Sequence, residues 1–260
     1  MRRARPAPRV LVVAGLDPSG GAGLVADLEA VRGAGADAWL VATALTAQGP
    51  GGARGFEPAG EAMVLRQIDA LVGRPGSAPS RGAERARAVK TGMLATAGIA
   101  RTLAARLAEA PLSRAPLVVD PVLAATSGAP LLDPGGLSPG EALAPLLARA
   151  RLATPNLAEL AVLSGREVDD DAAAVRAARL LPARAVLVKG GHRGGAALDL
   201  LVEGRRVTRF AGRRRPGTAR GTGCRLASAI AGWLARGAPL DEAVRRAKRA
   251  VERYLDRAAG

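Results

Sequence analysis

Several residue types are scarce in this 260-residue chain, and each scarcity excludes a class of protein. One cysteine, Cys224, and one histidine, His192, allow neither an internal disulfide nor a Cys/His zinc cluster. Aromatic residues make up 2% of the sequence, so the stacking platforms that bind single-stranded nucleic acid are missing. No uncharged apolar run reaches the roughly 18 residues of a membrane span. We therefore expect a reducing compartment, the cytoplasm, and no membrane as partner.

The charge balance is strongly basic, with a formal net charge of +15 from 38 Lys and Arg against 23 Asp and Glu. Lysine is rare, since only Lys90, Lys189 and Lys248 occur among many arginines in an Ala- and Gly-rich background. Such a bias favours a solvated basic surface over a nucleic-acid interface. Arginines before Val10 imitate the start of a signal peptide, but Asp17 ends the apolar run after about seven residues. A buried first strand is the favoured interpretation, and no nucleic-acid partner is expected.

Short apolar runs alternate with segments of helical periodicity along the chain. Strands are predicted at residues 10–14, 38–44, 88–90, 117–120, 151–154 and 185–189, and helices at 23–31, 59–72, 97–110 and 226–234. This alternation is typical of an α/β protein whose parallel sheet is covered by helices on both faces. Two further runs, 198–202 and 206–210, flank Glu203-Gly204 and predict a late antiparallel hairpin.

The length fits one large domain, and no linker divides the chain. We predict a single domain over residues 1–260. Residues 1–9 are predicted to form a basic N-terminal extension. Residues 73–86 are predicted to form a flexible surface loop, because they are rich in Gly, Pro, Ser and Arg and show no apolar period.

A glycine-rich segment, Gly217–Cys224, precedes the last predicted helix. Glycines let the backbone approach a ligand, and the start of a helix offers unpaired N–H groups, so this segment could hold a phosphate. A plain structural turn has the same spacing. No Walker-type motif occurs, which disfavours an ordinary P-loop ATPase. At the helix start the pKa of the Cys224 thiol is expected to fall, giving a usable base, while the alternative is a buried cysteine that acts as a small hydrophobe.

Two carboxylates follow predicted strands. Asp120 ends one strand, and Glu159 lies in Thr154-Pro-Asn156-Leu-Ala-Glu159 just after another. Carboxylates at neighbouring strand ends can hold a hydrated Mg²⁺ ion. The spacing of Asn156 and Glu159 equally fits a helix cap and its capping box.

Seven short motifs follow one another along the chain: Ala14–Gly23, Thr43–Gln48, Lys90–Leu94, Val119–Val122, Thr154–Glu159, Val188–His192 and Gly221–Cys224. As a set they resemble the bacterial hydroxymethylpyrimidine/phosphomethylpyrimidine kinases of thiamine biosynthesis, from about Val10 to Leu255. The resemblance implies a ribokinase-like, three-layer α/β/α fold with a mostly parallel central sheet. It also implies phosphorylation, with ATP and Mg²⁺, of 4-amino-5-hydroxymethyl-2-methylpyrimidine and then of its monophosphate.

The resemblance also implies roles for particular residues. Cys224 would be the catalytic base, and the backbone of Gly221, Thr222 and Gly223 would stabilise the transferred phosphoryl group. Asp120 and Glu159 would hold the metal. The pyrimidine pocket would comprise Gly15, Asp27, Gln48, Met93 and Val122, and the nucleotide site Asn156, Glu159 and Lys189.

Most ribokinase-like enzymes carry aspartate as the base at the end of this loop, whereas this chain carries Cys224, as the pyrimidine kinases do. The resemblance therefore favours pyrimidine kinases and cysteine-bearing pyridoxal kinases over sugar or nucleoside kinases. A pyridoxine/pyridoxal kinase is therefore one alternative, and a non-catalytic pyrimidine-binding protein is another. The chain departs from the family at Arg220 and Arg225, where histidine and a small polar residue are common, and at Thr126, where lysine is common. A homodimer is kept open as the assembly.

Overall fold

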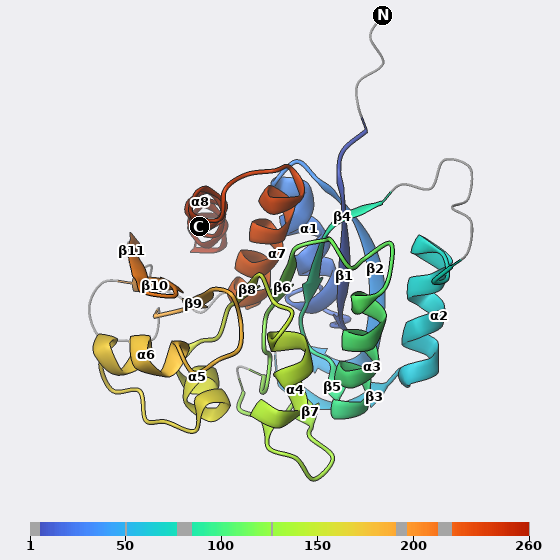
Figure 1. The fold of residues 1–260 in the computed structure, drawn as a ribbon, viewed down its shortest axis with the longest axis horizontal. Helices are drawn as coiled ribbons and strands as arrows, with labels where there is room; N and C mark the ends of the chain where they lie inside the picture. Colours follow the sequence, from blue (N-terminus) through green and yellow to red (C-terminus); the bar gives the residue numbers. More distant parts are fainter. Residues whose placement is uncertain are drawn as a thin grey trace, which may run out of the picture.

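Strands and helices alternate along the chain in the computed structural model (Figure 1), which describes residues 6–49, 51–76, 85–125, 127–190, 197–212 and 220–259. The strands are β1 (Arg9–Leu16), β2 (Asp37–Gly49), β3 (Gly52–Pro58), β4 (Ala86–Thr91), β5 (Ala95–Thr96), β6 (Leu117–Val119), β7 (Leu132–Asp133), β8 (Leu152–Ala153), β9 (Val186–Val188), β10 (Ala197–Glu203) and β11 (Arg206–Gly212). The helices are α1 (Gly23–Gly33), α2 (Glu61–Val72), α3 (Ala97–Ala108), α4 (Pro139–Leu147), α5 (Leu157–Ser164), α6 (Asp171–Ala178), α7 (Thr222–Ala235) and α8 (Leu240–Ala259).

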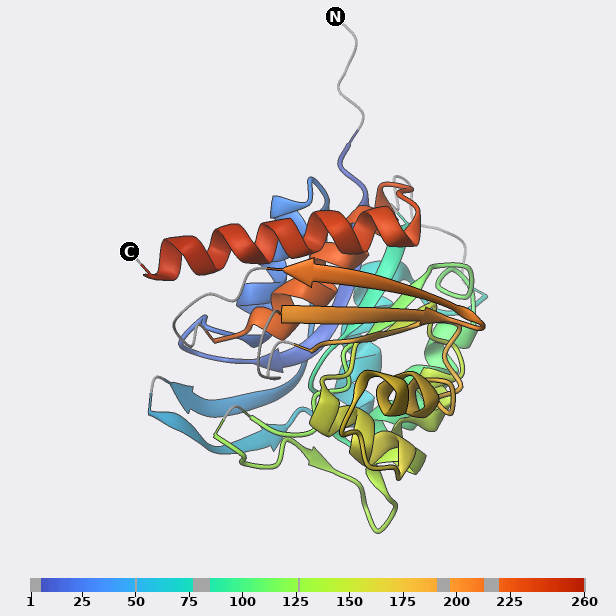
Figure 2. The same cartoon turned by 90° about the vertical axis from the view of Figure 1, so that its left-hand side faces the viewer.

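One nine-stranded sheet runs through the molecule in the order β11-β10-β9-β8-β6-β4-β1-β2-β3. Its six central strands pair in parallel, from β9 to β2, and antiparallel partners lie at both ends. The late hairpin β10–β11 is confirmed, and it lies beside α8 (Figure 2). The short strands β5 and β7 form a separate two-stranded sheet. The predicted α/β class with a mostly parallel sheet is therefore confirmed.

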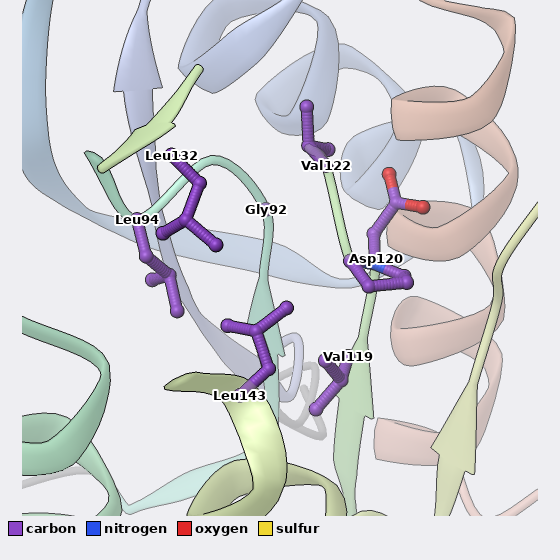
Figure 3. Close-up of a pocket in the computed structure, with 8 residues that line it drawn as sticks. Gly92, Leu94, Val119, Asp120, Val122, Leu132 and Leu143 are labelled. Carbon is purple, nitrogen blue, oxygen red and sulfur yellow. The ribbon is translucent and has the colours of Figure 1, made fainter. Parts of the chain in front are cut away.

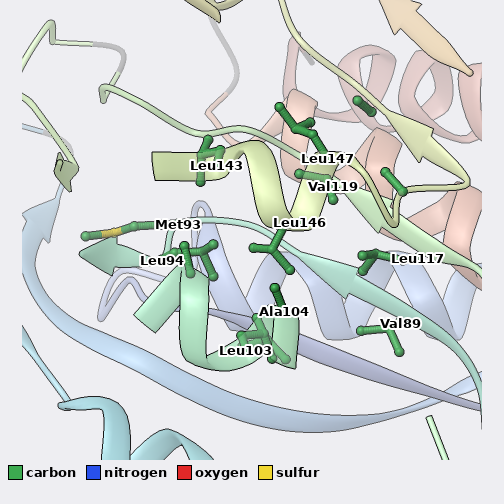
Figure 4. Close-up of a cluster of buried hydrophobic side chains, with 14 of the residues drawn as sticks. Val89, Met93, Leu94, Leu103, Ala104, Leu117, Val119, Leu143, Leu146 and Leu147 are labelled. Carbon is green, nitrogen blue, oxygen red and sulfur yellow. The ribbon is translucent and has the colours of Figure 1, made fainter. Parts of the chain in front are cut away.

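The core has two layers, one on each face of the sheet. Along β1, Leu11 and Val13 join the cluster under α2, α3, α4, α5 and α6, whereas Val10 and Val12 join the cluster under α1, α7 and α8. This division follows from the period of two in a strand, which sends successive side chains to opposite faces. Figure 4 shows part of the first cluster, where Leu103 of α3 and Leu146 of α4 gather over the strands.

Two predicted boundaries differ from the structure. Arg9 is the first residue of β1 and forms an ion pair with Asp37, so the basic extension ends before it. Ala86 begins β4, which shortens the predicted 73–86 loop. Residues 1–5 and 77–84, which make up most of these two predicted segments, lie outside the described residues. The single-domain organisation stays a prediction.

The parallel strands bring the polar ends of several motifs to one edge. Because β1, β4, β6, β8 and β9 run in the same direction, their carboxyl ends meet there. Ligands of such sheets bind beyond that edge. Among the described residues, the helices include none that is long and apolar enough to cross a membrane.

Candidate active site

The start of α7 forms the centre of the candidate site. Gly221 is the N-cap, in a left-handed conformation with φ +71°, and a Cβ there would lie 2.2 Å from the carbonyl oxygen of Gly21. Only glycine fits both requirements, so the Gly221–Cys224 segment and the 17–22 loop can touch. No side chain in the described part of the chain caps this helix. The N–H groups of its first turn, from Thr222 onward, are therefore available to an anion.

Asp17 connects the two sides of this junction. Its buried carboxylate accepts hydrogen bonds from the Ser19 backbone (2.9 Å) and hydroxyl (2.7 Å) and from Ala22 N–H (3.0 Å). The Gln48 amide (3.2 Å) and the Arg220 guanidinium (3.1 Å) donate to the same oxygen, Oδ2. Asp17 is not among the predicted site residues, although an aspartate that opens an Asp-Pro-Ser-Gly turn is a signal for such local hydrogen bonds.

The predicted pyrimidine-pocket residues fall into separate places. Gly15 and Met93 are in contact, since a Cβ on Gly15 would lie 2.8 Å from the Met93 sulfur. Val122 lines a small, mostly apolar pocket at the ends of β4 and β6, with Gly92 and Asp120. Figure 3 shows the Asp120 carboxylate turned away from the apolar side chains of Leu94 and Leu143 in this pocket.

Asp27 does not lie open to a ligand. It is fully buried, and both its oxygens accept hydrogen bonds from the Lys90 ammonium at 2.8 Å, while the Ser228 hydroxyl donates to Oδ1 at 2.7 Å. The expectation that Asp27 pairs directly with the pyrimidine therefore needs revision, because its hydrogen-bonding capacity is largely used inside the protein. Burial raises the pKa of Asp27, against the attraction of Lys90.

Lys90, predicted only as the first residue of the Lys90–Leu94 motif, lies directly behind the site. Its side chain is fully buried, and its Nζ would lie 2.8 Å from a Cβ on Gly92. Burial disfavours the ammonium, but the facing Asp27 carboxylate, together with Cys224 and Asp120, outweighs burial and raises the pKa of Lys90. A buried cation thus stands behind the turn that follows β4.

Cys224 lies in the first turn of α7 and is partly exposed. Burial, together with the charges of Asp27 and Asp120, raises the pKa of the Cys224 thiol to about 11, although Lys90 and the Gly23 N–H favour the thiolate. The prediction that the helix start lowers this pKa is therefore wrong. Desolvation and two nearby carboxylates exceed the dipole of a single helix end.

A second charged group lies on the other side of the loop. Lys189 Nζ donates to Asp120 Oδ1 at 2.8 Å and lies 3.8 Å from Glu159 Oε2, while the Thr154 hydroxyl donates to the same Asp120 oxygen at 3.0 Å. Burial opposes ionisation of Asp120, but Lys189 and Lys90 hold its pKa below the ordinary value. The pKa of Glu159 is raised by burial, and the two carboxylates in turn raise the pKa of Lys189.

Asn156 and Glu159 form the capping box of α5. Asn156 Oδ1 accepts from the Glu159 N–H at 2.8 Å, and Glu159 Oε2 accepts from the Asn156 N–H at 2.7 Å. The helix-cap interpretation is confirmed. Glu159 can still bind a metal, because the cap uses only one of its two oxygens and holds the carboxylate beside Lys189.

The donor set fits a hydrated Mg²⁺ ion that substrate phosphates complete. No group of three or more His, Cys, Asp or Glu side chains that could hold a metal occurs within the ranges that the structure describes. Asp120 and Glu159 nevertheless offer two carboxylates at one edge, and Mg²⁺ commonly takes one or two carboxylates with waters and phosphates. Lys189 lies between the two carboxylates, and its positive charge opposes the binding of a metal ion alone. Anionic phosphates bound with the metal would offset this repulsion.

The parallel sheet, the glycine loop at a helix start and the flanking lysine define a ribokinase-like small-molecule kinase. The chain matches the phosphomethylpyrimidine kinase family over residues 17–259. It belongs to this family, so the resemblance and the expectation of a kinase are both confirmed.

Curated relatives support the assignment. A thiamine biosynthesis bifunctional protein ThiED from Geobacter sulfurreducens is 43% identical over 96% of this chain, which spans 50% of that relative. A hydroxymethylpyrimidine/phosphomethylpyrimidine kinase from Rhizobium meliloti is 40% identical over 92% of this chain and 86% of that protein.

Solved structures show the same fold. A phosphomethylpyrimidine kinase from Clostridium difficile is 31% identical, with a TM-score of 0.76 over 95% of this chain and 99% of that one. A pyridoxal kinase from Staphylococcus aureus, in complex with AMP-PCP and pyridoxal, is 27% identical, with a TM-score of 0.78 over 95% and 87%. The predicted three-layer ribokinase-like fold is confirmed, and ATP as the donor fits a kinase family.

Proposed function

We propose that this chain transfers phosphate from ATP to 4-amino-5-hydroxymethyl-2-methylpyrimidine and then to the resulting monophosphate, in thiamine biosynthesis. The observation that carries the proposal is the meeting, at one sheet edge, of the Gly221–Cys224 loop with two polar groups. Asp17 and Gln48 lie on one side of the loop, and Asp120 and Lys189 on the other. The names of the relatives favour this substrate.

The acceptor would lie on the Asp17 side. The Gln48 amide can both donate and accept, which suits the amino group and ring nitrogen of an aminopyrimidine. Gly15, Met93 and Val122 would cover the apolar ring and methyl group. Asp27 would act indirectly, by holding Lys90 behind the loop.

The nucleotide phosphates would lie on the Lys189 side. Lys189 Nζ is directed at the loop, since a Cβ on Gly223 would lie 3.1 Å from it. Asp120 and Glu159 would hold Mg²⁺, which neutralises phosphate charge when it is bound. Backbone N–H groups of Thr222, Gly223 and Cys224 would bind the transferred phosphoryl group, whose negative charge suits a helix start.

Cys224 would take the proton of the hydroxymethyl group. With a thiol pKa of about 11 the Cys224 side chain is neutral at pH 7 in the protein alone, so the thiolate would form as the ligands bind. Neutralising the charge of Asp120 would remove one of the causes of the raised pKa. Positioning supplies most of the rate in phosphoryl transfer, and a weak base is sufficient.

The test is to incubate the purified protein with ATP, Mg²⁺ and either the pyrimidine alcohol or pyridoxal, and to follow products by mass spectrometry. We expect both the mono- and the diphosphate of the pyrimidine. Phosphorylation of pyridoxal alone would support the alternative, a pyridoxal kinase, which the Staphylococcus aureus neighbour favours. Binding of the pyrimidine with no product from either acceptor would indicate a non-catalytic binding protein.

We also propose a cellular compartment and an assembly for this protein. A biosynthetic kinase of this kind would work in the cytoplasm, with small molecules as its partners. A homodimer is the proposed assembly, and sedimentation of the purified protein tests it. A mass equal to one chain would contradict it.

A further inference from the structure

Arg220 is held at the boundary between the two loops of the site. Its Nη1 donates to the Ser19 hydroxyl at 3.1 Å and its Nη2 to Asp17 Oδ2 at 3.1 Å. The Tyr254 hydroxyl donates to its backbone oxygen at 3.2 Å, which fixes this residue against α8. Arg220 also directly precedes Gly221, the N-cap of α7. The guanidinium therefore lies beside the anion-binding loop, on the side of Asp17.

Three other cations near the loop are held elsewhere. Lys90 is fully buried in its pair with Asp27, and Lys189 lies between the carboxylates on the nucleotide side. Arg225 donates to Glu29 at 2.7 Å and stacks on the Tyr254 ring at 4.1 Å. The side chain of Arg220, by contrast, remains 25% exposed. Of these four, Arg220 is the cation placed to meet an acceptor.

The second phosphorylation creates a need for such a cation. Its acceptor is a phosphate monoester, which carries nearly two negative charges at neutral pH. That group must approach the anionic donor at the loop, so charge repulsion opposes the step unless a cation compensates. Arginine suits this task, because its planar fork binds phosphate oxygens with two parallel hydrogen bonds.

The contacts of Arg220 also explain how it could serve both steps. The described bonds to Ser19 and Asp17 use two of the five N–H donors of the guanidinium. With the uncharged alcohol bound, Asp17 neutralises the arginine. A phosphate that enters can bind the remaining donors or replace Ser19, while Asp17 and Gln48 keep their bond.

We propose that Arg220 binds the phosphate of the monophosphorylated acceptor and sets the preference of this site for that acceptor over the alcohol. This inference rests on the proposed two-step activity. It assigns to Arg220 a specificity role for a phosphate monoester, separate from the nucleotide contacts of Lys189.

The test compares kcat/KM for the pyrimidine alcohol and for its monophosphate in the wild type and in Arg220→Gln, at saturating ATP. We expect kcat/KM for the monophosphate to fall by about 10- to 100-fold, mainly through KM, the usual scale for a charged hydrogen bond. The alcohol should change less than about threefold. The dissociation constant of the monophosphate without ATP, measured by calorimetry, should rise in parallel.

The matched control is Arg225→Gln, which removes an arginine of the same helix end that contacts Glu29 instead. It should leave the ratio of the two acceptors unchanged. Equal losses of kcat/KM for both acceptors in Arg220→Gln would mean that Arg220 only holds the two loops together. A raised KM for ATP with an unchanged acceptor ratio would make it a nucleotide contact. Either result overturns the proposal.

A conservative variant keeps the test open if Arg220→Gln does not fold. Arg220→Lys retains the charge but loses the fork, and it should fall several-fold on the monophosphate only. An unchanged acceptor ratio in Arg220→Lys would then overturn the proposal. If the wild type phosphorylates neither acceptor, the proposed function itself is wrong, and the two failures are thereby distinguished.

Discussion

Two lysine–aspartate pairs stand on either side of the Cys224 loop, and they differ in burial although the shortest distance across each pair is the same. In both, the lysine nitrogen lies 2.8 Å from a carboxylate oxygen. The side chains of Lys90 and Asp27 are 0% exposed, whereas that of Lys189 is 15% exposed. The sealed pair can only hold the fold and set the local field, while the open pair can also meet a ligand.

The chain contains a third pair that serves as a reference. Lys248 of α8 binds Asp199 of β10, and Asp199 also accepts a hydrogen bond from the Gly190 N–H at 2.9 Å. All three lysines of the sequence thus face an aspartate. A lysine–aspartate pair by itself therefore says little about function, and its place in the sheet decides its role.

The largest expected effect is on stability, from breaking the sealed pair. Lys90→Met leaves the Asp27 carboxylate buried without its cation, which should lower the free energy of unfolding by about 3 to 5 kcal/mol in urea titrations. The double variant Lys90→Met with Asp27→Asn should recover most of the loss, because no unpaired charge remains. A single variant as stable as the wild type would show that this pair contributes nothing to the fold.

The next largest effect concerns the thiol that the two pairs flank. With a pKa of about 11, the thiolate fraction of Cys224 should still increase with pH above about pH 10, where an ordinary thiol with a pKa of about 8.5 is almost fully ionised. Alkylation by iodoacetamide at pH 7 should be slower than for a free thiol by roughly two to three orders of magnitude. Cys224 is the sole cysteine, so the modified mass reports on it alone. A rate that levels off by about pH 10, as expected for a thiol with a pKa of about 8.5, would contradict the raised pKa.

Removal of the thiol should mainly affect turnover. Cys224→Ala replaces a small side chain by a smaller one at a helix start, so we expect the thermal midpoint to change little. We expect kcat to fall by about a hundredfold, the usual scale for a general base. A folded variant with nearly wild-type turnover would mean that the thiol is structural and that another group takes the proton.

The smallest expected effect separates the open pair from the reference pair. Lys189→Gln should raise KM for ATP by about tenfold, because one charged contact to phosphate is lost. Lys248→Gln, which alters the pair between α8 and β10, should leave KM for ATP unchanged. Similar KM values in both variants would remove Lys189 from the nucleotide site.

Sequence patterns predicted the sheet better than its edges. The six parallel strands and the hairpin follow from short apolar runs separated by helical periods. The antiparallel strand β3 (Gly52–Pro58) was not predicted, because its exposed, glycine-containing residues carry no apolar alternation. Helix α7 begins at Thr222, four residues earlier than predicted. Glycine and threonine have low helix propensity, so the sequence does not indicate this start, which depends on packing against the 17–22 loop.

Motif order alone was enough to predict the family and the kinase fold, since these depend on local residue types and their spacing. It also predicted some of the residues that gather at the sheet edge, among them Asp120, Glu159 and Lys189. The tertiary structure alone decided which charges meet. It paired Asp27 with Lys90, gave Asp17 its contacts with Gln48 and Arg220, and raised the pKa of Cys224. Burial and the distance between charges set these properties, and both arise from contacts between segments up to about 200 residues apart.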